Sequence, residues 1–375
     1  MKLKSERNSM EKALILSIYP APYRVELFEK LKDEYNADVF FESGGGDYRE
    51  SEWFLSGNYY LLDTKEGKKA FLSAVKNIKK YDFAAFYDFT TKNALRVIPK
   101  CIFRRVPYAI NCDGVMMSPH GNPIFDLVKK FLVSHARACL ASGENAKKYF
   151  LKYGAQEKNI YKHTFSTLYQ SDILSRPISG SEKLEIRKKL GLPENMFISI
   201  AVGRFIPLKR YNYLIKEWKN MPENHLLLLV GSGSEEKTYR EIIDTNKIKN
   251  VRIEKFHPKN ELFDFYKASD VFVHPTSYDV WGLVVNEAFA CGLPCIVSDH
   301  CVAGLELIED NKNGFLIPMG NDKLLCERIK KIEDNEAEYD KMSLAALDTI
   351  RDYTIENMAK THIEVFRRLT ENVNN

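Results

Sequence analysis

Strand-like and helix-like segments alternate along most of the chain, and this alternation constrains the fold more than any other feature. Short apolar runs rich in β-branched and aromatic residues are separated by longer segments with helical periodicity. The runs lie at residues 13–19, 37–43, 83–88 and 107–113, and again at 197–205 and 225–233. Because strands joined by helical crossovers pair in parallel, the pattern predicts an α/β protein whose parallel sheets carry helices on both faces.

The alternation stops between residues 161 and 196, where turn residues accumulate. We therefore expect a linker near 170–182, an N-terminal domain over 11–175 and a C-terminal domain over 181–353. A length of 375 residues also exceeds that of most single cores. Each domain is expected to be a doubly wound, Rossmann-like unit, with ligands at the carboxyl ends of its strands and a central cleft between the two domains.

Composition excludes several classes of protein. No apolar run approaches the ~18–20 residues that a membrane span needs. The basic and then apolar start contains Glu6 and Glu11, which do not suit a signal peptide. The seven cysteines are odd in number and form no CxxC pair, so we expect reduced thiols in a cytoplasmic protein and no metal site.

Charge is distributed unevenly between the two halves. Residues 1–180 contain 28 Lys and Arg against 20 Asp and Glu, a net +8, and residues 181–375 contain 27 against 31, a net −4. Cations interleave with apolar residues at 96–108 and 126–139. Such segments favour peripheral contact with an anionic membrane, at the inner face of the plasma membrane. The alternative is that they are core helices whose apolar sides face the sheet.

Two strand ends in the C-terminal half suggest contact with an anion. The segment "VGRFIPLKRYNYLI" ends a strand at Gly203 and then supplies Arg204 and Lys209, cations that suit a diphosphate. They could equally be ordinary exposed loop cations. The segment "LLLLVGSGSEEK" ends a strand at Gly231 without the full G-x-G-x-x-G pattern. A tight strand-to-helix connection is its ordinary interpretation, although the backbone there could also approach a ligand closely.

The stretch "SYDVWGLVVNEAFACGLP" places two carboxylates eight positions apart. Its apolar periodicity predicts a helix that starts near Gly282 and stops at a Gly-Leu-Pro turn. Asp279 then lies just before the helix start, whose free amides can receive an anion, and Glu287 lies inside the helix. Vicinal hydroxyls of a sugar or ribose would satisfy such carboxylates, whereas a helix cap and a polar-face residue are the plainer alternatives.

Taken together, "VGRFIPLKR", "VGSGSEE" and "LFDFYKASDVFVHPTSYDVWGLVVNEAFACGLPCIVSD" resemble the retaining glycosyltransferases of family 4, which have a GT-B fold. The shared signature is an acid, seven residues and then Glu, with an aromatic-Gly pair after the first acid. "YPAPYRVELFEKL" and "YTIENMAKTHIEVF" are similar more loosely. The resemblance implies that a last helix over 354–372 crosses back to the N-terminal domain.

The resemblance also implies roles for individual residues. Arg204 and Lys209 match the basic pair that holds the diphosphate of a nucleotide-sugar donor. Glu287 matches the acid that contacts the ribose, and Asp279 matches the acid that contacts the transferred sugar. The backbone segment that approaches sugar and phosphate corresponds to Trp281, Gly282, Leu283 and Val284, and Gly203 and Gly231 complete the donor-binding set.

The chain departs from the family pattern in two places. Asp279 stands where Glu is usual, so its carboxylate is one methylene shorter. No glycine pair follows the first strand, and the run Gly44, Gly45 and Gly46 follows the second one. No Asp-x-Asp occurs either, so we expect no cofactor and a metal-independent reaction in which cations neutralise the diphosphate.

Two candidates in the N-terminal half could act on an acceptor hydroxyl. Asp113 follows a strand, and His120 lies shortly after it in "SPHGNP". Because Asp-Gly is a common turn and His120 lies in a loop, purely structural roles are open for both.

These observations predict a hexosyl-transferring enzyme that moves a sugar from a nucleotide-diphosphate sugar to a glycan or lipid-linked acceptor in bacterial capsule, exopolysaccharide or cell-envelope polysaccharide synthesis. The sequence predicts no nucleic-acid partner. A nucleotide-sugar epimerase, a phosphorylase-like enzyme of the same fold and a catalytically silent nucleotide-sugar-binding protein are the alternatives. A nicotinamide-dependent oxidoreductase is more distant, since no G-x-G-x-x-G follows a strand.

Overall fold

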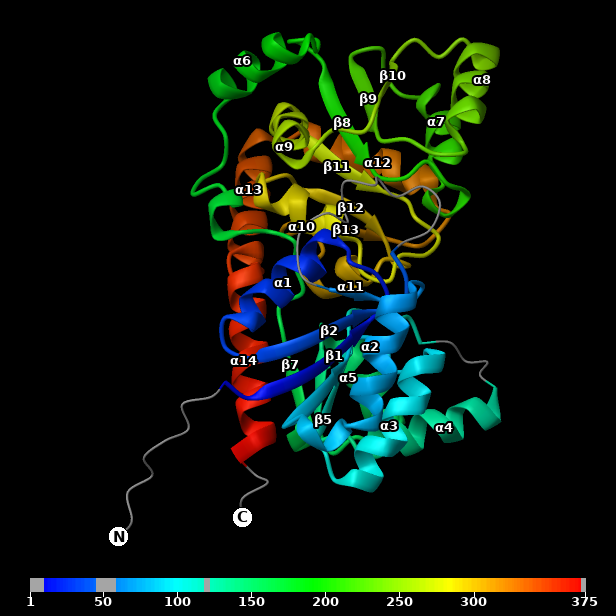
Figure 1. Ribbon diagram of the computed structural model, residues 1–375. Helices are drawn as coiled ribbons and strands as arrows, with labels where there is room; N and C mark the ends of the chain where they lie inside the picture. The colour runs from blue at the N-terminus through cyan, green and yellow to red at the C-terminus, as the bar shows by residue number, and fades with distance from the viewer. Residues whose placement is uncertain (1–9, 45–58, 118–121, 372–375) are drawn as a thin grey trace. The chain divides into compact units, whose positions relative to one another are not determined.

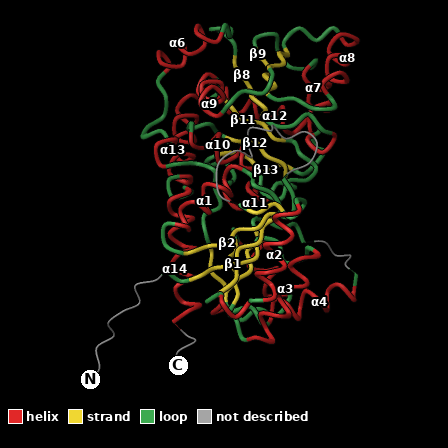
Figure 2. Tube along the Cα trace, in the orientation of Figure 1, coloured by secondary structure: helices red, strands yellow, loops and turns green. Residues whose placement is uncertain are grey.

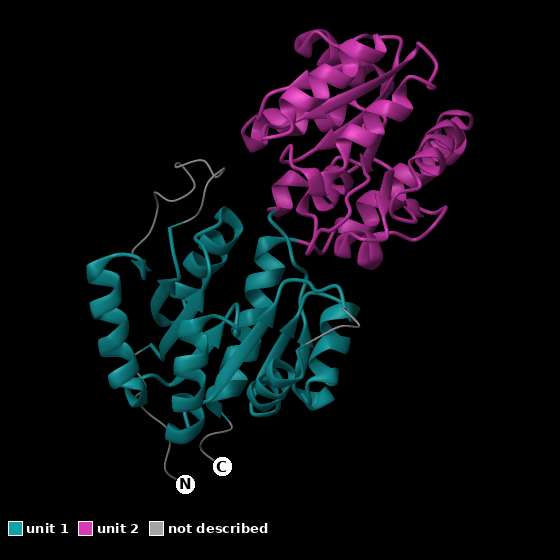
Figure 3. Cartoon of the chain, turned by 90° about the vertical axis from the view of Figure 1, so that its right-hand side faces the viewer, with its two compact units in different colours: residues 1–167, 354–375 teal, residues 168–353 magenta. Residues whose placement is uncertain are grey.

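The computed structural model describes residues 10–44, 59–117 and 122–371. They form two compact units (Figure 3): the described residues of 1–167 together with those of 354–375, and residues 168–353. Each unit has one parallel sheet, and Figure 2 shows the strands of each, in yellow, flanked by helices in red. The predicted fold class, two Rossmann-like α/β domains, is confirmed.

The first unit contains a seven-stranded parallel sheet in the order β3-β2-β1-β4-β5-β6-β7. Its central strands are buried runs of Ala, Leu, Ile and Phe, as expected for a sheet covered on both faces. The strands are β1 (Lys12–Ser17), β2 (Asn36–Phe41), β3 (Tyr60–Leu61), β4 (Phe83–Phe86), β5 (Tyr108–Cys112), β6 (Ala138–Ala141) and β7 (Ile160–Lys162). The helices are α1 (Pro22–Lys32), α2 (Lys65–Lys76), α3 (Lys92–Arg104), α4 (Pro123–Ser134), α5 (Glu144–Lys152) and α14 (Ile355–Glu371).

Helix α14 comes from the far end of the sequence and packs on the first sheet, as the family resemblance implied (Figure 1). It lies against α1 and against β4, β5 and β6. The Tyr35 hydroxyl donates a hydrogen bond to the carbonyl oxygen of Ile363 over 3.1 Å. The rings of Phe83 and Phe366 lie 4.9 Å apart, centroid to centroid. The C-terminal segment is therefore part of the first core.

The second unit contains a six-stranded parallel sheet in the order β10-β9-β8-β11-β12-β13. Its strands are β8 (Phe197–Val202), β9 (His225–Val230), β10 (Val251–Glu254), β11 (Val271–His274), β12 (Cys295–Ser298) and β13 (Gly314–Ile317). Its helices are α6 (Gly180–Leu190), α7 (Tyr211–Trp218), α8 (Glu236–Asn246), α9 (Lys259–Ala268), α10 (Leu283–Ala290), α11 (Val302–Leu307), α12 (Asp322–Glu333) and α13 (Glu336–Ile350).

Both sheets reverse their strand order at one point, between β1 and β4 in the first unit and between β8 and β11 in the second. The helices that follow neighbouring strands leave in opposite directions there, so a crevice opens at the carboxyl ends of those strands. The loops after these four strands are consequently where each unit is expected to bind a ligand.

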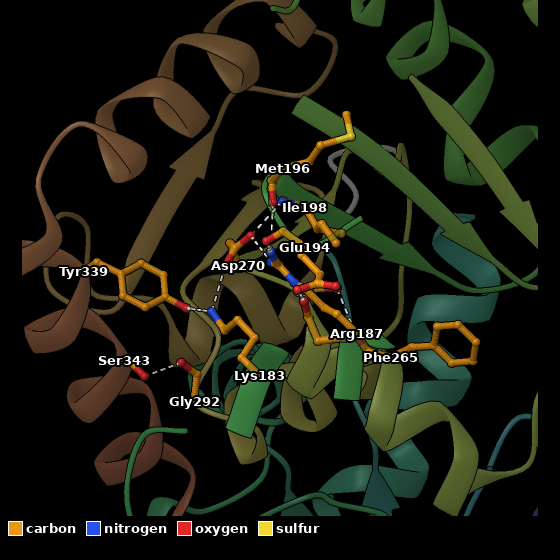
Figure 4. Close-up of polar contacts among 12 residues, drawn as sticks. Lys183, Arg187, Glu194, Met196, Ile198, Phe265, Asp270, Gly292, Tyr339 and Ser343 are labelled. Atoms are coloured by element: carbon orange, nitrogen blue, oxygen red, sulfur yellow. Dashed lines mark hydrogen bonds and ion pairs between the residues drawn. The ribbon is translucent and has the colours of Figure 1, made fainter. Parts of the chain in front are cut away.

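The expected loss of pattern over 161–196 was wrong in part, because this segment contains α6 and the end of β7. Helix α6 is polar, and its hydrophobic periodicity is correspondingly weak. A capping box between Ser179 and Glu182 starts it, and buried ion pairs hold it to the unit. Lys183 and Arg187 both pair with Asp270, over 2.7 and 2.6 Å (Figure 4). Arg187 also donates to the carbonyl oxygens of Glu194, Met196 and Ala268.

Candidate functional site

The loops after β8 and β9 touch each other at their glycines. Gly203, Gly231 and Gly233 have φ angles of 148°, 152° and 154°, which L side chains rarely adopt. A Cβ on Gly231 would lie 2.0 Å from the carbonyl oxygen of Gly203, and one on Gly233 would lie 2.4 Å from that of Phe205. Close backbone packing therefore explains Gly231 and Gly233, and it fixes the path of the loop that carries Arg204 and Lys209.

Lys209 ends the short turn Pro207–Lys209 and points back to the strand ends. Its side chain is 12% exposed, and its ammonium group donates to Oδ2 of Asp279. Asp279 lies in the loop after β11, so the contact bridges the reversal point between β8 and β11. The cation and the carboxylate predicted for the donor thus meet where a doubly wound sheet binds its ligand.

His274, the last residue of β11, completes this cluster. It is fully buried, and its Nε2 lies 3.0 Å from Oδ2 of Asp279. Burial lowers the pKa of His274, and the charge of Lys209 lowers it further against the opposing effect of Asp279, so the imidazole is neutral and donates through Nε2–H. Burial alone would raise the pKa of Asp279, but the bonds from His274 and Lys209 outweigh it and hold that pKa below its ordinary value. The Asp279 carboxylate is thus kept ionised and oriented.

The backbone around Asp279 is fixed by the loop after β12. The amide of Asp279 donates to the carbonyl oxygen of His300, and the amide of Val302 donates to that of Asp279. The Cys301 thiol donates to the carbonyl oxygen of Trp281 over 3.0 Å. His274, Asp279 and Cys301 bring their ligand atoms within 4.8 Å of one another, the separation that a metal ion would need. Lys209 already donates to the same carboxylate oxygen, so an ammonium group neutralises that charge.

Helix α10 starts beside the Asp279 carboxylate. Gly282 caps it with a φ of 99°, and a Cβ there would lie 2.5 Å from Sγ of Cys301 and 3.5 Å from Oδ2 of Asp279. The first amides of the helix, those of Leu283 and Val284, lack acceptors within the helix and form an anion-binding end. The Trp281 indole turns inward and donates to Asn286 over 3.0 Å. The Trp281 indole N–H is therefore already satisfied within the unit.

Glu287 lies one turn into α10 and does not touch the Asp279 cluster. Its Oε2 accepts a hydrogen bond from the Tyr266 hydroxyl of α9 over 2.9 Å. Burial raises the pKa of Glu287 to about 7, although the bond from Tyr266 and the charge of Lys259 lower it. The carboxyl group therefore changes charge near neutral pH, which is common for a functional carboxylate and costly for a structural one.

In the first unit, Asp113 follows β5 and is held by two side chains. Arg24 of α1 pairs with its Oδ2, and Asn111 donates to its Oδ1 over 2.6 Å. Burial raises the pKa of Asp113 against both partners. Arg24 is itself buried over the Tyr87 ring, and its Nη1 has no hydrogen-bond partner within the described residues. His120 lies outside the described residues.

Comparison with known proteins finds a family match in the second unit. Residues 182–348 match the model of the family described as Glycosyl transferases group 1. Most of the second unit is thus similar to a group 1 glycosyltransferase domain. This domain contains every residue predicted to bind the donor, and the match bears out the predicted enzyme class.

Relatives of known sequence match over the same region. A protein named as an uncharacterized glycosyltransferase of Haemophilus influenzae is 30% identical over 207 residues, which cover 54% of this chain and 56% of that protein. The Escherichia coli UDP-Gal:alpha-D-GlcNAc-diphosphoundecaprenol alpha-1,3-galactosyltransferase is 30% identical over 158 residues, 40% of each chain. The alignment thus spans about half the length of the first of these relatives.

Among solved structures, the Anabaena protein Alr3699/HepE in complex with UDP superposes with a TM-score of 0.78. The match covers 95% of this chain and all of that one, at 18% sequence identity. At that identity the likeness concerns the fold, and it extends the agreement from the group 1 domain to both units.

Within residues 182–348 the predicted donor residues do not all lie together. Lys209 and Asp279 are in contact, the segment Trp281–Val284 starts the neighbouring helix, and Glu287 lies one turn further on. Arg204 is exposed in the loop after β8. His274 and Tyr266 are the partners that sequence reasoning missed. The position of His274 at the end of the strand "VFVH" was a signal that the sequence offered. Nothing in the sequence pairs Tyr266 with Glu287.

Proposed function

We propose that this protein transfers a sugar, with retention of its anomeric configuration, from a nucleotide-diphosphate sugar to a glycan or lipid-linked acceptor. The observation that carries the proposal is the contact between Lys209 and Asp279 at the reversal point of the second sheet, beside the start of α10. A cation, a carboxylate and free helix amides there can meet the diphosphate and the hydroxyls of one donor.

Each residue then has a chemical task. In the transfer, the bond from the anomeric carbon to the diphosphate oxygen breaks, and a bond from that carbon to the acceptor oxygen forms. The proton of the acceptor hydroxyl passes to the leaving diphosphate. Negative charge grows on the leaving diphosphate, where Lys209, Arg204 and the α10 amides lower its energy. Lys209 gives up Asp279 for the diphosphate, and the freed Asp279, still held by His274, accepts from the sugar hydroxyls. Glu287 holds the ribose.

The proposed setting is the synthesis of a bacterial capsule, exopolysaccharide or cell-envelope polysaccharide at the inner face of the plasma membrane. The name of the Escherichia coli relative, which specifies UDP-Gal and a diphosphoundecaprenol acceptor, supports a nucleotide-sugar donor and a lipid-linked acceptor. No described helix is long and apolar enough to cross a bilayer. We propose that catalysis needs no metal, since Lys209 and Arg204 would neutralise the charge of the leaving diphosphate.

The test begins with a thermal-shift screen of UDP-, GDP- and ADP-sugars, followed by incubation of the stabilising donor with and without acceptor. Transfer to the acceptor, with the donor's anomeric configuration in the product by NMR and full activity in EDTA, is the expected result. An epimerised sugar formed without acceptor would instead identify an epimerase. Nucleotide-sugar binding without transfer or hydrolysis would identify a silent binding protein.

A further inference from the structure

Helix α4 of the first unit presents an apolar stripe to solvent. Ile124, Leu127, Val128 and Phe131 follow one another at helical spacing on one side of the helix. They are 75%, 69%, 36% and 47% exposed, respectively. A surface helix normally turns such a stripe toward the core, and contiguous exposed apolar residues mark a surface that binds something. We call these four side chains the α4 stripe.

The other residues of α4 explain why the stripe faces outward. Asp126 accepts a hydrogen bond from the Tyr153 hydroxyl over 2.7 Å, and Lys129 lies over the Tyr153 ring. Leu132 and Val133 are buried in the core of the unit. These contacts with Tyr153, just after α5, and with the core fix the rotation of α4, so the helix cannot bury its stripe without losing them. Figure 1 shows α4 at the margin of the unit.

The segment of the chain that carries the stripe is strongly basic. Residues 92–152, which run from α3 to α5, contain 11 Lys and Arg against three Asp and Glu, a net +8. One of these acids is Asp126 itself, which is turned inward to Tyr153. This segment therefore accounts for the whole positive excess of residues 1–180.

A basic hollow continues the surface at the carboxyl end of α4. It has a volume of about 710 Å³ and is lined by Ser134 and His135 at the end of the helix, together with Arg137, Lys158 and Arg368. Its lining contains no Asp or Glu. The His135 ring also packs against Phe131, 4.7 Å between centroids, so the hollow adjoins the stripe directly.

We propose that α4 docks the protein on an anionic lipid bilayer, with the α4 stripe in the headgroup–acyl boundary and the basic hollow against the lipid phosphates. Apolar side chains at helical spacing beside a concentration of cations are what an interfacial helix needs, because insertion and charge attraction each bind weakly alone. A protein partner would have to match this same apolar and cationic combination. The inference deepens the proposed function and rests on it in one respect. A lipid-linked acceptor is the reason that the protein would need to bind a membrane.

Co-sedimentation with vesicles tests the proposal. The native protein is expected to bind vesicles of equal parts phosphatidylcholine and phosphatidylglycerol, and to bind pure phosphatidylcholine at least tenfold less. Replacing two stripe residues (Leu127→Ser with Phe131→Ser) should reduce binding to the mixed vesicles at least tenfold. Replacing two cations (Lys130→Gln with Arg137→Gln) should reduce it by about fivefold for each charge and weaken its salt dependence.

The matched control replaces exposed leucines elsewhere, Leu72→Ser with Leu344→Ser, which are 59% and 49% exposed on α2 and α13. It should leave vesicle binding unchanged. All variants should keep the native circular dichroism and native binding of nucleoside diphosphates, so a folding defect or a failed donor site is recognised separately. Equal sedimentation of the native protein and the stripe variant would overturn the proposal. So would a native dimer that binds no vesicles and becomes monomeric in the stripe variant.

Discussion

Glu287 is expected to cost the protein stability at neutral pH. Its pKa, ordinarily 4.5, is raised to about 7 by burial. A raised carboxyl pKa contributes stability that is fully present below pH 4.5 and lost as the pH rises through 7, because the unfolded chain ionises first. A shift of this size corresponds to about 3 kcal/mol at pH 8, and to about 1 kcal/mol or less at pH 5. Glu287→Gln removes the charge and keeps an oxygen for the Tyr266 hydroxyl.

The variant should therefore be more stable than the native protein by about 3 kcal/mol at pH 8, with most of the difference gone at pH 5. Urea unfolding is followed by the fluorescence of Trp218 and Trp281, two of the three tryptophans, both buried in the second unit. The exposed Glu223→Gln is the matched control and should change stability at neither pH. The same Glu287→Gln variant should bind nucleoside diphosphates more weakly, since it loses the carboxylate proposed to hold the ribose.

A stability difference that is equal at pH 5 and pH 8 would refute this reasoning, because it would show that the carboxylate is not held in a costly environment. Residues that bind a ligand often cost the folded protein stability, and Glu287 would be such a residue.

Three further predictions concern other parts of the molecule. Asp279→Asn should free Lys209, so the affinity for UDP measured by calorimetry should rise about tenfold while sugar transfer falls at least tenfold. A parallel loss of affinity and transfer would contradict the proposed exchange of Lys209 between Asp279 and the diphosphate. Gly231→Ala should cost about 3 kcal/mol in urea unfolding, because its Cβ meets backbone at 2.0 Å, whereas Gly180→Ala, which meets nothing within 4 Å, should be neutral. His362 is fully buried, and burial lowers its pKa to about 3, so NMR should find its ring neutral at pH 5. Because the unfolded chain binds this proton first, the free energy of unfolding should fall by about 2 kcal/mol between pH 6.5 and pH 5. Titration of the folded-state ring near pH 6.5 would contradict the buried site.

The alternation of segments was sufficient to predict the two parallel sheets and the helices between them, because buried strands and amphipathic helices differ in period. The return of the last helix was predicted only through the family resemblance, since nothing in its own residues says which core it joins. Helix α6 was missed because buried Lys and Arg, and not an apolar stripe, hold it in place.

The donor site was predictable where single residues follow strand ends, as Lys209 and Asp279 do. Its supporting contacts were not, because they join residues distant in sequence or of unremarkable type, such as Tyr266 with Glu287. Asp113 was singled out by its position after a strand, but the sequence did not reveal that Arg24 and Asn111 hold it. The interleaved cations of 126–139 left two interpretations open, and the exposed stripe of α4 favours the membrane.

Lys209 offers the most direct test of the central claim that the reversal point of the second sheet binds a nucleotide diphosphate. Calorimetric titration with UDP, GDP and ADP would compare the native protein with Lys209→Met and with the control Lys216→Met, a cation of α7 that lies over the Tyr213 ring. Loss of a charged hydrogen bond of about 1.5–3 kcal/mol should weaken binding of the preferred nucleotide roughly ten- to a hundredfold in Lys209→Met, and leave Lys216→Met unchanged. Equal affinities in all three proteins would contradict the account.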